Sequence, residues 1–232
     1  MGNTYPPSSS SFSDNASAYI NAIASFLVST KAPLLANVYP YFAYLSDPTD
    51  IKLDYALLNS SGVVVQDGNL GYQNLFDAMM DSLYSALEKI GAANLTIVVT
   101  ETRWPSDGSV VATVDNVGTY YKNLISHVNN GTPKRPRPLE TYFFALFDED
   151  QKETQFDEKA FDTKDNSGPA KFSMEVFNDQ KGARLVEGAR MKLAGSKSCW
   201  QNAYWNLFAG CLDIFSGMRS DLDLLGILVI AF

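Results

Sequence analysis

The chain has 232 residues, of which 46% are hydrophobic and 12% aromatic, and its formal net charge at pH 7 is −8. This content of apolar side chains is sufficient for a substantial core and excludes a generally disordered chain. The acidic balance argues against a nucleic-acid partner, because nucleic-acid binding depends on basic side chains that neutralise phosphates. A chain of this length holds one large domain, or one domain and a tail.

Charge and cysteine content divide the chain near residue 178. Residues 1–177 carry 12 basic and 21 acidic side chains, whereas residues 178–232 carry 6 basic and 5 acidic. We therefore expect a principal domain over 1–177 and an unassigned tail over 178–232, which is either a helical packing segment or translated non-coding or misjoined sequence. Both cysteines, Cys199 and Cys211, lie in the tail and form either one disulfide or two free thiols.

Apolar residues recur with the spacing of helices and strands over most of the principal domain. In chain order, the pattern predicts a helix at 14–31 with Asp14 as N-cap, a strand at 34–42, a hairpin of 53–58 with 62–66, a helix at 72–90, a strand from 96 to 101, a helix at 114–128 and a strand at 140–147. This alternation predicts parallel strands joined by right-handed crossovers, and therefore an α/β fold.

The most informative segment is Thr96–Ser106, with the sequence TIVVTETRWPS. A β-branched run leads to Glu101 where the apolar character ends, just before a Trp-Pro-Ser turn. Barrel enzymes place reacting groups at the C-terminal ends of their strands. Together with NVYPYF at 37–42 and FDEDQK at 147–152, this segment resembles the plant endo-1,3-β-glucanases of glycoside hydrolase family 17.

The resemblance covers only the later part of that family's fold. It implies the C-terminal portion of a TIM (β/α)8 barrel over residues 1–177, with the N-terminal strands missing and an unrelated tail from 178. The pattern shows three clear barrel strands where a complete barrel has eight. An open barrel exposes strand edges, and such edges favour self-association.

The resemblance also implies a reaction, the endo-hydrolysis of 1,3-β-D-glucosidic bonds in β-glucans with retention. Retaining glycosidases use two carboxyl groups, one as nucleophile and one as acid and base. The resemblance makes Glu101 the nucleophile and gives supporting roles to Glu149, Lys152 and Glu158. The alternative interpretation is a solvated carboxylate at a strand end and, for the other three residues, a solvated acidic loop.

The family carries its general acid in a Gly-Asn-Glu setting, which this chain lacks. Its nearest match, Gly2-Asn3, is followed by Thr4. General acid assistance is worth roughly 10²–10⁴-fold in rate. The sequence therefore leaves two functions open: a glucanase, and a truncated, non-catalytic homologue that at most binds β-glucan.

Polar and aromatic side chains near the ends of two strands are the expected substrate contacts. The resemblance assigns this role to Asn37, Tyr39, Tyr41 and Trp104. Aromatic faces stack on pyranose rings and an amide hydrogen-bonds a hydroxyl, although an aromatic cluster is more often core. We expect the neighbouring Phe42 to belong to the core.

Arg103 stands where the family usually has glycine. If the strand continues, its guanidinium lies on the same side as Glu101, two residues away, and holds that carboxylate ionised. If the strand ends first, the side chain turns out to solvent. We expect the second arrangement.

No cofactor or metal is expected. His127 is the only histidine, it has no evident partner, and no glycine-rich phosphate loop follows a strand. The expected partner is β-1,3-glucan, with no nucleic acid and no obligate protein partner. The last apolar run, 224–232, is about half the ~20 residues of a membrane span.

The resemblance implies an extracellular, cell-wall or vacuolar location and a part in plant defence. The first residues contain neither a basic region nor an apolar region typical of a signal peptide, so none is expected in this chain. Glycosylation sequons begin at Asn15, Asn59, Asn94 and Asn130.

Overall fold

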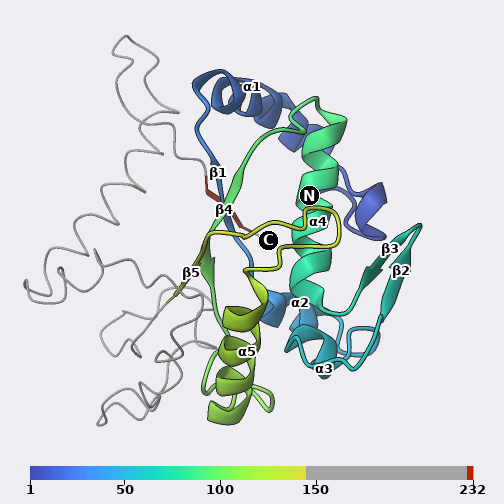
Figure 1. Ribbon diagram of the computed structural model, residues 1–232, viewed down its shortest axis with the longest axis vertical. Helices are drawn as coiled ribbons and strands as arrows, with labels where there is room; N and C mark the ends of the chain where they lie inside the picture. The colour runs from blue at the N-terminus through green and yellow to red at the C-terminus, as the bar shows by residue number, and fades with distance from the viewer. Residues whose placement is uncertain (145–228, 232) are drawn as a thin grey trace, which may run out of the picture. The chain divides into compact units, whose positions relative to one another are not determined.

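A parallel sheet with the strand order β5–β4–β1–β6 organises the part of the chain that the computed structural model describes, residues 1–144 and 229–231 (Figure 1). Its strands are β1 (Leu34–Asn37), β4 (Ile97–Thr102), β5 (Thr141–Phe143) and β6 (Val229–Ala231). Each neighbouring pair is parallel, which confirms the parallel α/β arrangement predicted from the alternating pattern. All described residues belong to one compact unit.

The central strands are built largely from apolar residues, and one face of each strand is fully buried. Leu34 and Ala36 of β1, and Ile97 and Val99 of β4, are all fully buried. Continuous apolar runs are typical of parallel strands covered on both sides, which explains why local sequence predicted them. Strand β6 pairs with the edge of β1 that faces away from β4.

Three long helices connect and cover these strands: α1 (Asp14–Thr30), α4 (Leu75–Lys89) and α5 (Val114–His127). Each begins after a polar N-cap whose side chain accepts a backbone amide hydrogen, namely Ser13, Asn74 and Thr113. The prediction of Asp14 as N-cap is therefore wrong by one residue, because Ser13 has the extended backbone that a cap requires and Asp14 begins the helix.

The strand expected at 34–42 is shorter than predicted. It ends at Asn37, and Pro40–Ser46 form the helix α2, with Tyr39 as its N-cap. A proline at the first helical position costs no hydrogen bond, and its fixed φ suits the helix. The Tyr-Pro pair therefore begins a helix where the apolar pattern predicted a continuing strand.

The predicted hairpin is also displaced along the chain. Residues Leu53–Ala56 form the short helix α3, and the hairpin pairs β2 (Val65–Asp67) with β3 (Leu70–Tyr72). Gly68 adopts a positive φ of 58° in its turn. The two loop residues are Gly68 and Asn69, since Asp67 pairs with Leu70, and glycine at the first loop position adopts positive φ without strain. A short 3-10 helix, η1 (Pro7–Ser9), precedes α1.

The basic loop at 132–138 runs along α4 before the chain enters β5 (Figure 1). The backbone amide of Lys134 donates to Asp81 Oδ2 at 2.9 Å, and its Nζ lies 2.8 Å from Glu88 Oε2. Arg135 completes the attachment, with its Nη2 atom 2.6 Å from Glu88 Oε1. Carboxylates on one face of α4 therefore fix the loop that leads into β5.

Of the tail predicted over 178–232, the structure describes only Val229–Ala231, which is a strand rather than a helix. The other residues of that segment, with both cysteines, lie outside the described part of the chain. No helix among the described residues has the length and apolar character that a membrane span requires.

Candidate active site

Glu101 lies near the C-terminal end of β4, beside the C-terminal end of β1. Asn37, the last residue of β1, is its partner in the ladder. Asn37 Nδ2 donates a hydrogen bond to Glu101 Oε2 at 3.0 Å, and the hydroxyl of Tyr39 donates to the same oxygen at 2.7 Å. All three side chains are partly buried. The structure thus brings together three of the residues that the sequence selected, on two neighbouring strand ends.

Two donors on one carboxylate oxygen fix the plane of the Glu101 carboxyl group. Hydrogen bonds to a charged group are shorter and stronger than those between neutral groups. A held, partly exposed carboxylate at a strand end is suited to attack an electron-poor carbon or to accept a proton.

An irregularity in the ladder occurs next to Glu101. Ala36 pairs with Val99, but the next residue, Asn37, pairs with Glu101, so Thr100 is an extra residue in β4. Its hydroxyl Oγ1 donates to Asn37 Oδ1 at 2.9 Å. The sequence analysis did not select Thr100 as a site residue, because a one-residue bulge depends on the register of the neighbouring strand.

Two of the expected substrate contacts lie in the core instead. Tyr41 is 0% exposed and Trp104 is 1% exposed, and their rings meet edge to face at 5.2 Å between centroids. Trp104 Nε1 donates to the backbone oxygen of Val111, and the Tyr41 hydroxyl donates to Ser109 Oγ. The expectation of direct sugar contact is therefore wrong for both in this structure, where they pack beneath the strand ends.

Phe42 shows the opposite error. It was expected in the core, but its side chain is 39% exposed. Both residues lie in helix α2 and not in a continuing strand, and in this helix Tyr41 faces the core and Phe42 faces the surface. The Phe42 ring lies 5.5 Å from the ring of the partly exposed Tyr39. These two rings form an aromatic rim beside Glu101.

Arg103 is only 6% exposed, so the expectation that it turns out to solvent is wrong. Strand β4 continues through Thr102 instead of ending earlier, and the chain then passes directly into the buried Trp104-Pro105 pair. Arg103 is therefore buried directly after the strand that carries Glu101.

The supporting residues Glu149, Lys152 and Glu158 lie outside the described residues. Within the described part, no group of three or more His, Cys, Asp or Glu side chains is placed to hold a metal ion.

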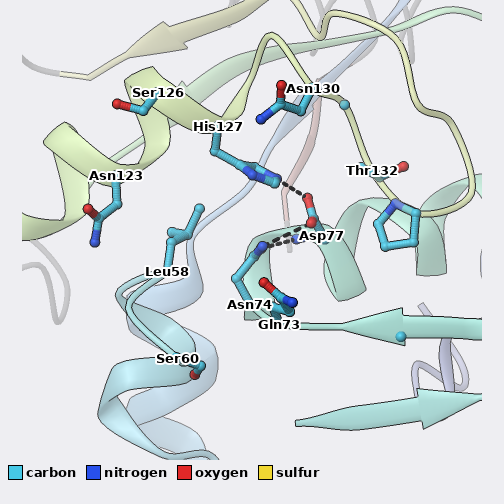
Figure 2. A pocket seen from close by; sticks show the side chains of 13 residues that line it. Leu58, Ser60, Gln73, Asn74, Asp77, Asn123, Ser126, His127, Asn130 and Thr132 are labelled. Carbon is cyan, nitrogen blue, oxygen red and sulfur yellow. Dashed lines mark hydrogen bonds and ion pairs between the residues drawn. The ribbon is translucent and has the colours of Figure 1, made fainter. Parts of the chain in front are cut away.

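A second feature is a polar pocket of about 500 Å³ between α4, α5 and the loop at 130–133 (Figure 2). His127 Nε2 lies 2.7 Å from Asp77 Oδ1, and Asn74 Nδ2 donates to Asp77 Oδ2 at 2.9 Å. Asn123 on the same wall donates to the backbone oxygen of Leu57. These polar groups hold neighbouring elements together, which is a structural role. The partner of His127, which sequence alone did not indicate, is Asp77.

The fold and this site define a class of protein, an α/β protein whose parallel strands carry a hydrogen-bonded carboxylate near a strand end. Residues 1–176 match the family described as Glycosyl hydrolases family 17, and the chain belongs to this family.

Relatives with known names support the same assignment. The chain is 60% identical over 161 residues to a glucan endo-1,3-beta-glucosidase of Vitis vinifera, in a match that covers 69% of this chain and 47% of the relative. It is 45% identical over 188 residues to a glucan endo-1,3-beta-glucosidase of Pisum sativum, covering 81% of this chain and 50% of the relative. A relative from Nicotiana plumbaginifolia, 52% identical over 157 residues, covers 68% of this chain and 43% of that protein, and is named a basic vacuolar isoform.

Solved structures of plant glucanases share the fold. One, from a study of two plant beta-glucan endohydrolases with distinct substrate specificities, has a TM-score of 0.64 at 47% identity and covers 66% of this chain and 50% of its own. A β-1,3-glucanase and allergen of Cryptomeria japonica pollen gives 0.61 at 51% identity, covering 63% and 46%. These neighbours are TIM barrels. The chain spans about half the length of the curated relatives it matches.

Proposed function

We propose that this chain carries the nucleophile of a retaining endo-1,3-β-glucanase, with Glu101 in that role. The observation that carries the proposal is the Glu101 carboxylate, held by Asn37 and Tyr39 at the C-terminal end of parallel strands. Membership of family 17 and the names of the relatives support the substrate, a β-1,3-glucan.

In the proposed reaction, a Glu101 oxygen attacks the anomeric carbon of a β-1,3-linked glucosyl unit. The bond to the leaving sugar oxygen breaks, and that oxygen takes a proton from a carboxylic acid. The same acid group, now a carboxylate, removes a proton from water, which attacks the glycosyl-enzyme and releases Glu101. Two inversions give net retention, and the two carboxyl groups suffice for these steps without a cofactor.

Glu149 and Glu158 are the first candidates for the proton donor, with Lys152 placed between them in sequence to balance their charge. Tyr39 and Phe42 form the aromatic rim on which a pyranose ring would stack. The names of relatives as vacuolar isoforms support a vacuolar location, with the cell wall or the extracellular space as the other compartment that the family resemblance favours.

The test is release of reducing sugar from laminarin by the purified chain, beside its Glu101→Gln variant. A dinitrophenyl β-laminaribioside is measured in parallel, because its leaving group departs without protonation and reports the nucleophile by itself. We expect turnover of the aryl glycoside that is lost in the variant, with the β-anomer as the first product by NMR.

Each outcome has a definite meaning. Equal rates for the parent and the variant would overturn the role of Glu101. Binding of laminarin without release of either product would favour the non-catalytic glucan-binding homologue. Hydrolysis of the aryl glycoside but not of laminarin would locate the deficiency in proton donation.

A further inference from the structure

Thr100 and Glu101 are consecutive residues of β4, yet both contact the same side chain. Thr100 Oγ1 lies 2.9 Å from Asn37 Oδ1, and Glu101 Oε2 lies 3.0 Å from Asn37 Nδ2. In a regular strand, consecutive side chains point to opposite faces of the sheet. This pair escapes that rule because Thr100 is the extra residue of the bulge opposite Asn37.

The bulge affects the ladder on both sides of β4. On the side of β1, Val99 and Glu101 pair with consecutive residues, and on the side of β5, Val99 pairs with Thr141 and Thr102 with Phe143. One residue of β4 is therefore unmatched on each side. Bulges bend a strand and re-aim side chains, and they are frequent beside active sites.

The donors and acceptors of this group permit only one arrangement. The ionised Glu101 carboxylate only accepts hydrogen bonds, so the amide nitrogen of Asn37 must face it. The amide oxygen then faces Thr100, whose hydroxyl must donate its single proton to that oxygen. The other acceptor in reach, the backbone oxygen of Ala36, is more distant at 3.4 Å.

We propose that Thr100 is a positioning residue for the nucleophile, which acts through Asn37. Its hydroxyl holds the Asn37 amide with the nitrogen toward Glu101, and so fixes the carboxylate that attacks the anomeric carbon. Without the hydroxyl, the amide oxygen of Asn37 loses this donor, so the amide plane and the nitrogen that donates to Glu101 are held less firmly. This inference rests on the proposed function and extends it to a residue that does not contact the carboxylate itself.

The test compares Thr100→Val, which keeps the shape and β-branching, with Thr100→Ser, which keeps the hydroxyl. On the aryl β-laminaribioside we expect Thr100→Val to lower kcat about tenfold, with KM changed less than about twofold, because orientation and not binding is lost. The kcat of Thr100→Ser, which keeps the hydroxyl, should stay within about threefold of the parent value.

A purely structural role predicts a different pattern. Thermal stability would then follow the number of methyl groups, so Thr100→Ser, which removes one, would be less stable than Thr100→Val, which removes none, and kcat of the folded fraction would stay constant in both. That pattern, or a Thr100→Ser variant as slow as Thr100→Val, would overturn the proposal.

A second readout does not depend on catalysis. The side-chain NH₂ of Asn37 should exchange slowly with water in NMR spectra of the parent and Thr100→Ser, and several-fold faster in Thr100→Val. If the parent hydrolyses nothing, the proposed activity fails while the exchange rates still decide the role of Thr100. Equal exchange in all three proteins would overturn that role.

Discussion

The hydroxyl oxygen of Tyr39 lies 2.7 Å from Glu101 Oε2, although the two residues are 62 positions apart in the sequence. Tyr39 is the N-cap residue of α2, just beyond the end of β1. The contact therefore depends on two features at once: the parallel pairing of β1 with β4, and the end of β1 before Pro40. It links the geometry of a helix start to the orientation of the proposed nucleophile.

Tyr39→Phe should lower kcat/KM on a β-1,3-glucan by roughly 10–100-fold. The change removes one charge-assisted hydrogen bond to Glu101 and keeps the ring, and a hydrogen bond to a charged group is worth about 1.5–3 kcal/mol. The apparent melting temperature should change little, because the phenol is only partly buried. Steady-state kinetics and thermal unfolding of the same preparation check both statements, and full activity in the variant would exclude the role of this bond.

Much of the frame could be predicted from the sequence, because it follows from local patterns. The apolar runs of β1 and β4 and the helical spacing of α1, α4 and α5 each lie within one segment. The sequence also selected Asn37, Tyr39 and Glu101, whose side chains the structure places in contact. Parallel strands bring their C-terminal ends to one edge, so residues 64 positions apart, Asn37 and Glu101, could be expected to meet.

The features that sequence did not predict depend on contacts between segments. The bulge at Thr100 is a relation between β4 and its neighbours, and no residue type marks it. Asp77 and His127 lie 50 positions apart on two helices, and the spacing of polar residues does not show which helices pack together. The start of α2 is different, because Pro40 does indicate the first residue of a helix. The apolar run from 34 to 42 nevertheless favoured a strand at this point.

Asp81 should make the stability of the chain depend on pH. It is fully buried, and burial raises its pKa to about 6 from the ordinary value of 3.8, more than the hydrogen bonds from its neighbours lower it. The folded state therefore binds more protons than the unfolded state between about pH 4 and 6. Protonated Asp81 therefore contributes stability at low pH, and this contribution is lost as the pH rises through this window.

The measurement is the free energy of unfolding of the parent and of the Asp81→Asn variant at several pH values from about 4 to 7. The asparagine side chain would still accept the hydrogen bond from the Lys134 amide but would not titrate. As the pH rises across this range, we expect the free energy of unfolding of the variant to increase relative to that of the parent by about 2 kcal/mol. A constant difference between the two proteins would contradict a raised pKa at Asp81.

His127→Ala should destabilise the fold by about 1–3 kcal/mol without a direct effect on the site around Glu101. The change removes the partner of Asp77, whose side chain is buried at the start of α4, and leaves that carboxylate with Asn74. Adding Asp77→Asn in the same protein removes the buried charge and should restore part of the loss. Chemical denaturation of both variants measures this coupling, and two strictly additive losses would show that the pair contributes nothing.

Gly131 is the position where we expect the largest effect of a single methyl group. Its φ is +71°, and a Cβ atom there would lie 2.2 Å from the backbone oxygen of Arg137 and 2.3 Å from that of Arg135. These are backbone atoms of the loop that α4 holds through Glu88, so they cannot move without breaking that attachment. Gly131→Ala should therefore cost about 4 kcal/mol or more.

Gly91→Ala is the matched control, because Gly91 also has a positive φ, +81°, but a Cβ atom there would meet nothing within 4 Å. The Gly91→Ala variant should lose only the free energy that a left-handed backbone costs alanine, about 1–2 kcal/mol. The difference between the two variants in denaturant unfolding isolates the steric term. Equal losses would mean that the loop at 132–138 yields to the added methyl group, and that its attachment to α4 is weaker than the ion pairs of Glu88 indicate.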